Sequence, residues 1–301
     1  MRIGGPVTAG REYLLRLWDA AAAAAGERKS WLYLHGYTQR FPDSSPLASG
    51  PSIIEELARA NTSQAGWDAS WQVEEAAADG RVLGHRPGAR RWFEPGEYLS
   101  LSGPGHRPGA GDPIRVHVAR ESQTLQDAFY YAFGETVNRH GPRNGGLRIY
   151  WNVQQAGAAP LMAALTRHFN RFQIPFRFKC VHRAGHFARL DAAVLYLDRS
   201  YWAFAAPVLR RIVDDVGEGL AAGTPLFARP LAPGLALAED PPGGSSFGQH
   251  RCALLAEAIE RCPAGSAEDR WSALEERFQA RGLRLDRPYL NAGSEDTYDF
   301  S

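Results

Sequence analysis

Residues 174–182 read I-P-F-R-F-K-C-V-H, and this alternation of apolar and polar side chains predicts a β-strand. Alternate residues of a strand share one face. Phe176 and Phe178 therefore point to one side, which suits a hydrophobic core, while Arg177 and Lys179 point to the other. A fold that contains this strand must bury one of its faces and keep two neighbouring cations on the opposite face.

The rest of the sequence reads as strands and helices around this segment. Turn-rich residues 61–120 predict short antiparallel strands, whereas the chain from 147 onward alternates strands with helices. Ser266 and Asp269 form a capping box for a last helix. The other expected helices are 11–25, 52–60, 161–172, 208–220 and 247–261, and the other expected strands are 71–73, 81–83, 97–101, 114–118, 147–153, 192–197 and 235–238.

These elements predict an α+β fold with a central antiparallel or mixed sheet flanked by helices. The chain has 301 residues, of which 44% are hydrophobic, and this is ample for a buried core. No linker divides the sequence, so a single domain is expected over 1–301. It would consist of a helical segment 1–60, a sheet-rich core 61–200 and a helical C-terminal part 201–301.

The charge balance and the apolar runs point to a cytoplasmic protein. The formal net charge is +1, which does not indicate a nucleic-acid or membrane-surface partner. No apolar run approaches the roughly 20 residues that span a bilayer, and no signal peptide is visible. The three cysteines are an odd number, which fits reduced thiols better than a disulfide framework.

Lys179 is unusual because only one other lysine, Lys29, occurs in the chain; all other basic residues of the Lys and Arg type are arginines. A second cation at Arg177, together with partial burial, would lower the pKa of the Lys179 amine toward neutral pH. Such an amine can act as a general base, and the neighbouring guanidinium can bind a phosphate. The alternative is a solvated outer face of a sheet.

Arg189 and Asp191 lie two residues apart just before an apolar strand, so both side chains share one face. Arg189 could bind an anion while Asp191 orients it. The alternative is a buried structural ion pair.

Residues 238–251 read A-E-D-P-P-G-G-S-S-F-G-Q-H-R. A Gly- and Ser-rich turn that opens a helix gathers free backbone N–H groups, which suit a phosphate near Ser246 and Arg251. The alternative is an ordinary N-capped helix with a flexible entry.

Two other patterns in this region carry less weight. Residues 244–248 match the G-x-S-x-G elbow of α/β-hydrolases, but no strand runs directly into them and no His follows His250. Cys180, His182 and His186 lie close in sequence, yet no second Cys or His pair completes a zinc site. Neither a hydrolase nor a metal site is therefore predicted.

Eight short segments follow one another in an order that is characteristic of one family: G-W-D-A-S-W at 66–71, P-G-E-Y at 95–98, F-Y-Y-A-F-G at 129–134, R-I-Y-W-N at 148–152, P-F-R-F-K at 175–179, R-L-D-A-A-V-L-Y at 189–196, A-E-D-P at 238–241 and S-F-G-Q-H-R at 246–251. Between 67 and 261 the chain resembles the HopA type III effector-like proteins. The bacterial biosynthetic members of that family are lyases of class V lanthipeptide and thioamitide pathways.

The resemblance implies a lyase without metal or other cofactor that acts after a kinase. A partner similar to aminoglycoside phosphotransferases would phosphorylate Ser or Thr in a ribosomal precursor peptide, and the lyase would then form dehydroalanine or dehydrobutyrine. One departure is that a tyrosine is expected near Phe187, so no proton donor is expected at that position. Two other functions stay open: a non-catalytic peptide escort of the kinase, and a secreted virulence effector that binds a host protein.

On the lyase hypothesis, each candidate residue receives a role in phosphate elimination. Lys179 removes the α-proton. Asp191 belongs to the site that binds the phosphate, where it orients the group at Arg189. The general acid is open, with Tyr150 as a candidate. The candidate ligands of the phosphate are Arg177, Arg189, Arg148, Arg251 and Ser246.

Overall fold

The computed structural model describes residues 6–137 and 145–301 of the chain. The α-helices in these ranges are α1 (Pro6–Ala23), α2 (Arg28–Leu32), α3 (Ile54–Ala60), α4 (Gln155–Arg171), α5 (Trp202–Val216), α6 (Phe247–Arg261) and α7 (Ala267–Gln279). A π-helical turn, η1 (Tyr33–Tyr37), continues α2, and the 3₁₀ turns are η2 (Ala184–Ala188), η3 (Arg199–Tyr201) and η4 (Gly217–Gly219). None of the helices in the described parts of the chain is long and apolar enough to cross a membrane.

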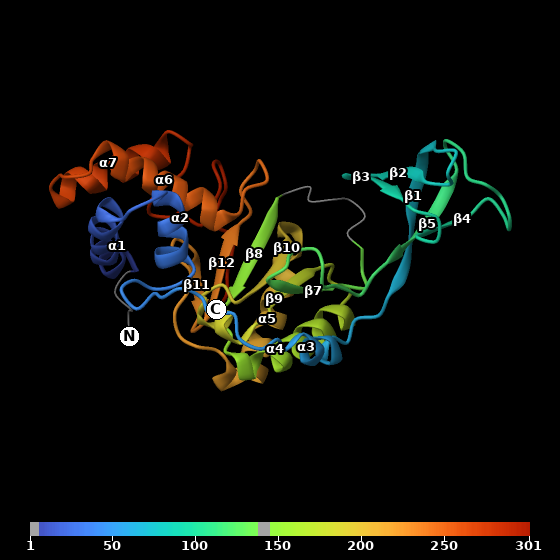
Figure 1. Cartoon of the computed structure of the whole chain (residues 1–301), viewed down its shortest axis with the longest axis horizontal. Coiled ribbons are helices and arrows are strands. Elements are labelled where there is room, and N and C mark those ends of the chain that lie inside the picture. Colours follow the sequence, from blue (N-terminus) through green and yellow to red (C-terminus); the bar gives the residue numbers. More distant parts are fainter. Residues whose placement is uncertain (1–5, 138–144) are drawn as a thin grey trace.

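The described strands form two sheets, and every pair of neighbouring strands is antiparallel. One sheet has the order β3-β2-β1-β5-β4, from β1 (Gly66–Ala76), β2 (Val82–Arg86), β3 (Ala89–Phe93), β4 (Tyr98–Ser100) and β5 (Pro113–Val118). The other has the order β11-β12-β8-β10-β9-β7-β6, from β6 (Glu121–Ser122), β7 (Phe129–Phe133), β8 (Gly146–Trp151), β9 (Arg177–Val181), β10 (Ala193–Asp198), β11 (Arg229–Ala232) and β12 (Leu235–Glu239). Figure 1 shows the five-stranded sheet at one end of the molecule and helices α1, α6 and α7 at the other.

The α+β class predicted from the sequence is confirmed, as is the capping box of Ser266 and Asp269 at the start of α7. Two helices begin earlier than predicted, because Pro160 and Pro207 lie inside α4 and α5 rather than at their starts. Strand β7 was not predicted. Its sequence, F-Y-Y-A-F, has no apolar–polar alternation, because four of its five residues are buried.

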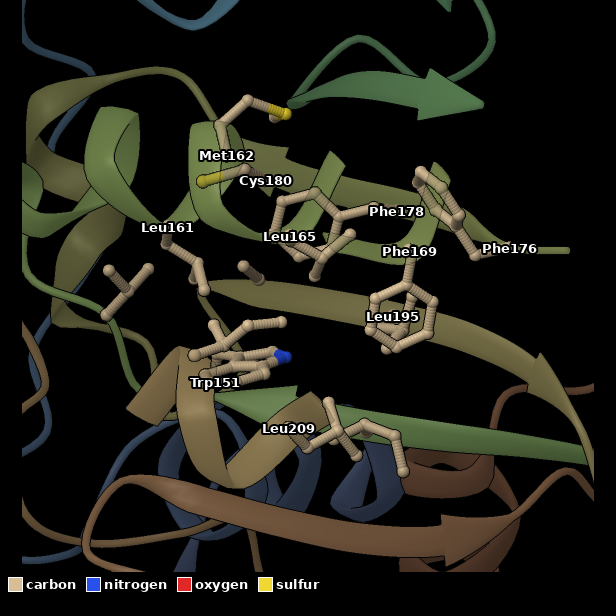
Figure 2. Packing of buried hydrophobic residues seen from close by; sticks show 14 of the residues in the cluster. Trp151, Leu161, Met162, Leu165, Phe169, Phe176, Phe178, Cys180, Leu195 and Leu209 are labelled. Atoms are coloured by element: carbon tan, nitrogen blue, oxygen red, sulfur yellow. The ribbon is translucent and has the colours of Figure 1, made fainter. Parts of the chain in front are cut away.

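One face of the seven-stranded sheet packs against α4 and α5 and forms the main core. Figure 2 shows Phe178 and Leu195 of the sheet facing Leu165 and Phe169 of α4, and all four side chains are fully buried. This confirms that the Phe178 side of β9 points inward. The predicted helix 161–172 included Phe172, but this residue follows the end of α4 and is 53% exposed.

The opposite face of the sheet is only partly covered. Over β12, β8 and β10, Ala236, Tyr150 and Val194 are buried in a second cluster with side chains from α1, η1 and α6. Over the neighbouring strand β9, Arg177 is exposed and Lys179 is partly exposed. The two cations predicted to share a face therefore lie where the helical cover ends.

Helix α6 approaches η1 closely through Gly248. A β-carbon at Gly248 would lie 2.4 Å from Cε1 of Tyr37, which is far inside van der Waals contact. The second glycine of the G-S-S-F-G segment is therefore required by packing against a tyrosine, and not by a nucleophile elbow.

We expect Gly248→Ala to lower the free energy of unfolding by about 1–3 kcal/mol, because the added methyl group must displace the Tyr37 ring. Gly10→Ala is the control: Gly10 lies in α1, and a β-carbon there would have no neighbouring atom within 4 Å, so this change should stabilise by about 0.5–1 kcal/mol. Urea denaturation measures both. Equal stabilities of Gly248→Ala and the wild type would contradict the packing.

Candidate functional site

Three strands bring the predicted cations together on the open face. Arg148 of β8 lies opposite Tyr196 of β10, which lies opposite Arg177 of β9. Directly opposite residues of antiparallel strands project from the same side of a sheet. The guanidinium carbons of Arg148 and Arg177 lie 5.1 Å and 4.2 Å from the centroid of the Tyr196 ring. Tyr196 is thus held between two cations.

Lys179 lies in the next row of this face, opposite Val194. Its Nζ lies 4.0 Å from the centroid of the Phe129 ring and donates a hydrogen bond of 3.1 Å to Oε1 of Gln126. The same Oε1 accepts a hydrogen bond of 2.9 Å from the hydroxyl of Tyr131. The amine is therefore fixed between an aromatic face and a loop amide.

The pKa of Lys179 is lowered to about 8, and burial of the amine is the largest cause. Charge repulsion from Arg148, Arg189 and Arg177 contributes to this lowering, while the Asp191 carboxylate acts in the opposite direction. A fraction of roughly one tenth of such an amine is unprotonated at pH 7. Lys179 can therefore accept a proton at neutral pH, which an ordinary surface lysine does rarely.

Arg189 and Asp191 form a bidentate ion pair. Nε donates to Oδ1 at 2.9 Å and Nη2 donates to Oδ2 at 3.0 Å, with side-chain exposures of 14% and 8%. Burial lowers the pKa of Arg189, but the Asp191 carboxylate and Tyr33 together outweigh it, so the pKa is raised and the guanidinium stays charged. The ion pair predicted as the alternative is present, and it leaves Nη1 without a hydrogen bond to the described residues. Asp191 thus positions Arg189, whose remaining edge can still accept an anion.

Arg148 is held by a partner that the sequence did not suggest. Its Nε donates to Oδ1 of Asp240 at 2.6 Å, and Asp240 follows β12 in the A-E-D-P segment. Arg177, by contrast, forms no ion pair with the described residues. Of the two arginines that contact Tyr196, Arg177 is therefore the more available to an incoming anion.

The prediction that Arg251 binds a phosphate is not supported by its position. Arg251 is fully buried and donates from Nε to the Pro288 carbonyl at 2.7 Å and from Nη2 to the Leu290 carbonyl at 2.9 Å. Its guanidinium holds the C-terminal segment against α6.

Ser246 is the N-cap of α6, and its Oγ accepts a hydrogen bond of 3.3 Å from the backbone N–H of Gln249. The alternative of a capped helix therefore describes this loop.

Tyr150, the candidate general acid, lies in the same row as Lys179 but is only 2% exposed. Burial raises its pKa, and its hydroxyl lies beside that of Tyr37. Among the described residues its oxygen has no hydrogen bond of normal geometry. A substrate on the open face would not reach this hydroxyl without movement of η1.

Several residues of the site could not be found from the sequence. Tyr196 is the one with a local signal, because it shares the face of Val194 on a predicted strand. The others lie in β7, in loops or in the distant π-helical turn η1, where spacing in the sequence gives no information on contact. They are Gln126, Phe129, Asp240 and Tyr33.

The fold and the site together define an α+β protein with a lysine-centred cationic site on the open face of an antiparallel sheet. Residues 120–290 match the HopA1 effector protein family. This match covers more than half of the chain, and the chain therefore belongs to that family. The family resemblance expected from the eight sequence segments is confirmed. No curated protein matches the sequence.

Two solved structures share the fold. The effector protein from Pseudomonas syringae pv. tomato strain DC3000 has a TM-score of 0.56 and 17% identity, over 94% of this chain and 97% of that one. The effector protein from Pseudomonas syringae pv. syringae strain 61 has a TM-score of 0.53 and 18% identity, over 94% of this chain and 98% of that one. At such identities the likeness concerns the fold alone.

We expect the amine of Lys179 to titrate near pH 8, because burial holds its pKa well below that of an ordinary lysine. Reductive ¹³C-methylation followed by NMR titration measures this pKa, and a Lys29→Arg variant assigns the signal, since Lys29 is the only other lysine of the chain. A Lys179 signal that titrates at or above the ordinary lysine value would contradict the burial of this amine.

The same titration tests the contact with Gln126. Gln126→Glu places a carboxylate beside the ammonium group, so the pKa of Lys179 should rise by at least one unit. Gln126→Leu removes an acceptor that favours the charged form, so the pKa should fall. Shifts of the same sign in both variants would show that the loop acts in another way.

Proposed function

We propose that this protein is a lyase that eliminates phosphate from phosphoserine or phosphothreonine in a ribosomally made precursor peptide. The products would be dehydroalanine or dehydrobutyrine in lanthipeptide or thioamitide biosynthesis, after phosphorylation by a kinase similar to aminoglycoside phosphotransferases. The observation that carries the proposal is the Lys179 amine, whose pKa is lowered to about 8 in a cluster of arginines that stay charged. Elimination needs this pairing of a base with an anion site.

The side chains divide the reaction between them. The neutral amine of Lys179 takes the α-proton, and the electrons of that C–H bond form the double bond to Cβ. The bond between Cβ and the bridging oxygen breaks, and the phosphate leaves toward the guanidinium groups of Arg177 and Arg189. Fixed cations at the place where negative charge develops lower the barrier without reorganisation.

A second candidate function is that of an effector that binds a phosphorylated host protein without changing it. It is favoured by the family and by the two structural neighbours, which are effector proteins. A non-catalytic escort of a kinase would use the same cationic face. Either binder would need positive charge at position 179 but no proton acceptor, so arginine would serve there as well as lysine.

Lys179→Ala should lower the rate of elimination by about 10²- to 10⁴-fold, and Lys179→Arg should not restore it, because a guanidinium does not accept a proton at working pH. The assay is mass spectrometry of a phosphorylated precursor peptide in EDTA, with and without the kinase. Loss of phosphoric acid by the wild type supports the lyase. Unchanged phosphopeptide that binds equally to the wild type and Lys179→Arg favours the binder.

Thermal unfolding controls for loss of fold. Lys179→Met removes a charge that burial disfavours, so its melting temperature at pH 7 should equal or exceed that of the wild type. If Lys179→Met is inactive but stable, the loss of activity results from the missing amine and not from unfolding. A strongly destabilised variant would show that Lys179 has a structural role.

The pH dependence should follow the base. The value of kcat/KM should rise with pH and level off above about 8, since it reports the unprotonated amine of the free enzyme. A bound phosphate dianion favours the ammonium form of Lys179. The rise of kcat with pH should therefore occur at a higher pH than the rise of kcat/KM. A kcat/KM that falls through pH 8 would contradict the assignment.

A further inference from the structure

Tyr33 contacts Arg189, the arginine proposed to bind the phosphate. It does so from the π-helical turn η1, which lies outside the matched family region. Nη2 of Arg189 approaches the Tyr33 hydroxyl oxygen at 3.5 Å, and the two residues are 156 positions apart in the sequence. The guanidinium is the donor in this contact, so the phenol keeps its own proton. That O–H has no acceptor among the residues that the structure describes.

The position of Tyr33 is fixed from several sides. The π-helical turn is closed by a hydrogen bond of 2.9 Å from the Thr38 N–H to the Tyr33 carbonyl. The Thr38 carbonyl in turn accepts a hydrogen bond of 2.7 Å from the N–H of Leu190, between the two members of the ion pair. The Tyr33 ring stacks on Tyr37 with centroids 5.4 Å apart. The phenol and the guanidinium are therefore held together by backbone and not by the side-chain contact alone.

Other tyrosines around the cluster are less suited to give up a proton. Tyr131 already donates to Gln126, and Tyr150 is buried. Tyr196 presents its ring face to two guanidinium groups. Tyr33 combines an uncommitted proton, partial exposure and direct contact with a guanidinium that has a free edge.

We propose that Tyr33 is the catalytic residue that protonates the departing phosphate while Arg189 binds it. The proton moves from the Tyr33 oxygen to the bridging oxygen as the Cβ–O bond breaks, and the electron pair of that bond goes to the phosphate. Lys179 gains the α-proton in the same reaction. Transfer of this proton through water from the Lys179 ammonium group to the Tyr33 phenolate then restores both groups. This inference rests on the proposed lyase function and assigns the general acid for it.

The basicity of the leaving group explains why a phenol suits this role. A phosphomonoester dianion that leaves without a proton becomes a trianion, which is a strong base, so even a weak acid assists its departure. Burial, together with the Asp191 carboxylate, raises the pKa of Tyr33 to about 12, and Arg189 acts against them. The phenol therefore stays protonated across the working range and gives up its proton only as the strong base forms.

The test compares Tyr33→Phe with the wild type on two peptides that differ only in the leaving group, phosphoserine and O-thiophosphoserine. Thiophosphate is the less basic leaving group. Tyr33→Phe should lower kcat by about 10²- to 10⁴-fold on phosphoserine and by clearly less on thiophosphoserine. Affinity for a phosphonate analogue that cannot eliminate should stay within a factor of about three, because the phenol is not needed for binding.

Two matched variants complete the experiment. Tyr37→Phe removes a hydroxyl from the same turn and should show wild-type kinetics on both peptides, and Tyr196→Phe tests the competing phenol. The inference is overturned if Tyr33→Phe is fully active, if its loss is equal for both leaving groups, or if Tyr196→Phe shows the leaving-group dependence instead. An inactive wild type would overturn the lyase function itself, whereas an active wild type with an active Tyr33→Phe overturns this assignment alone.

Discussion

The register of β8, β10 and β9 sets the chemistry of this protein. Because the three strands pair without a shift, Arg148, Tyr196 and Arg177 form one row across the sheet and Tyr150, Val194 and Lys179 form the next. A slip of one residue would turn these side chains into the core and bring apolar side chains to the surface. The main core on the other face, in which Trp151, Phe178 and Leu195 are fully buried, holds the register in place.

Charge in the site is compensated unevenly. Asp191 pairs with Arg189 and Asp240 pairs with Arg148, so these guanidinium groups are held in position. Arg177 and Lys179 have no acidic partner at hydrogen-bond distance among the described residues. The positive charge of the site is therefore only partly compensated, and a bound anion would stabilise it. For Lys179 the unfolded chain binds the proton more tightly, so this residue alone makes stability rise with pH between about 8 and the ordinary lysine pKa.

The helices over the sheet do more than cover it. The close approach of α6 through Gly248 places Tyr37, and the π-helical turn then carries Tyr33 to the edge of the covered area. π-Helical turns are often found at functional sites, since the extra residue changes the direction of the side chains. The matched family region, residues 120–290, contains the cations but not this turn.

The sequence by itself determined the class of the fold, the two faces of β9 and the exceptional position of Lys179, because alternation and composition are local properties that can be read along the chain. It left open whether the pair of Arg189 and Asp191 was structural or functional. The sequence also suggested Arg251 as a phosphate ligand. In the structure this side chain is buried and donates hydrogen bonds to the C-terminal segment.

Only the tertiary structure brought Asp240 to Arg148, Gln126 to Lys179 and Tyr33 to Arg189. These pairs are separated by 92, 53 and 156 positions. The physical reason is that such contacts arise when helices and loops close over a sheet, and no periodicity in the sequence records which distant residues then meet.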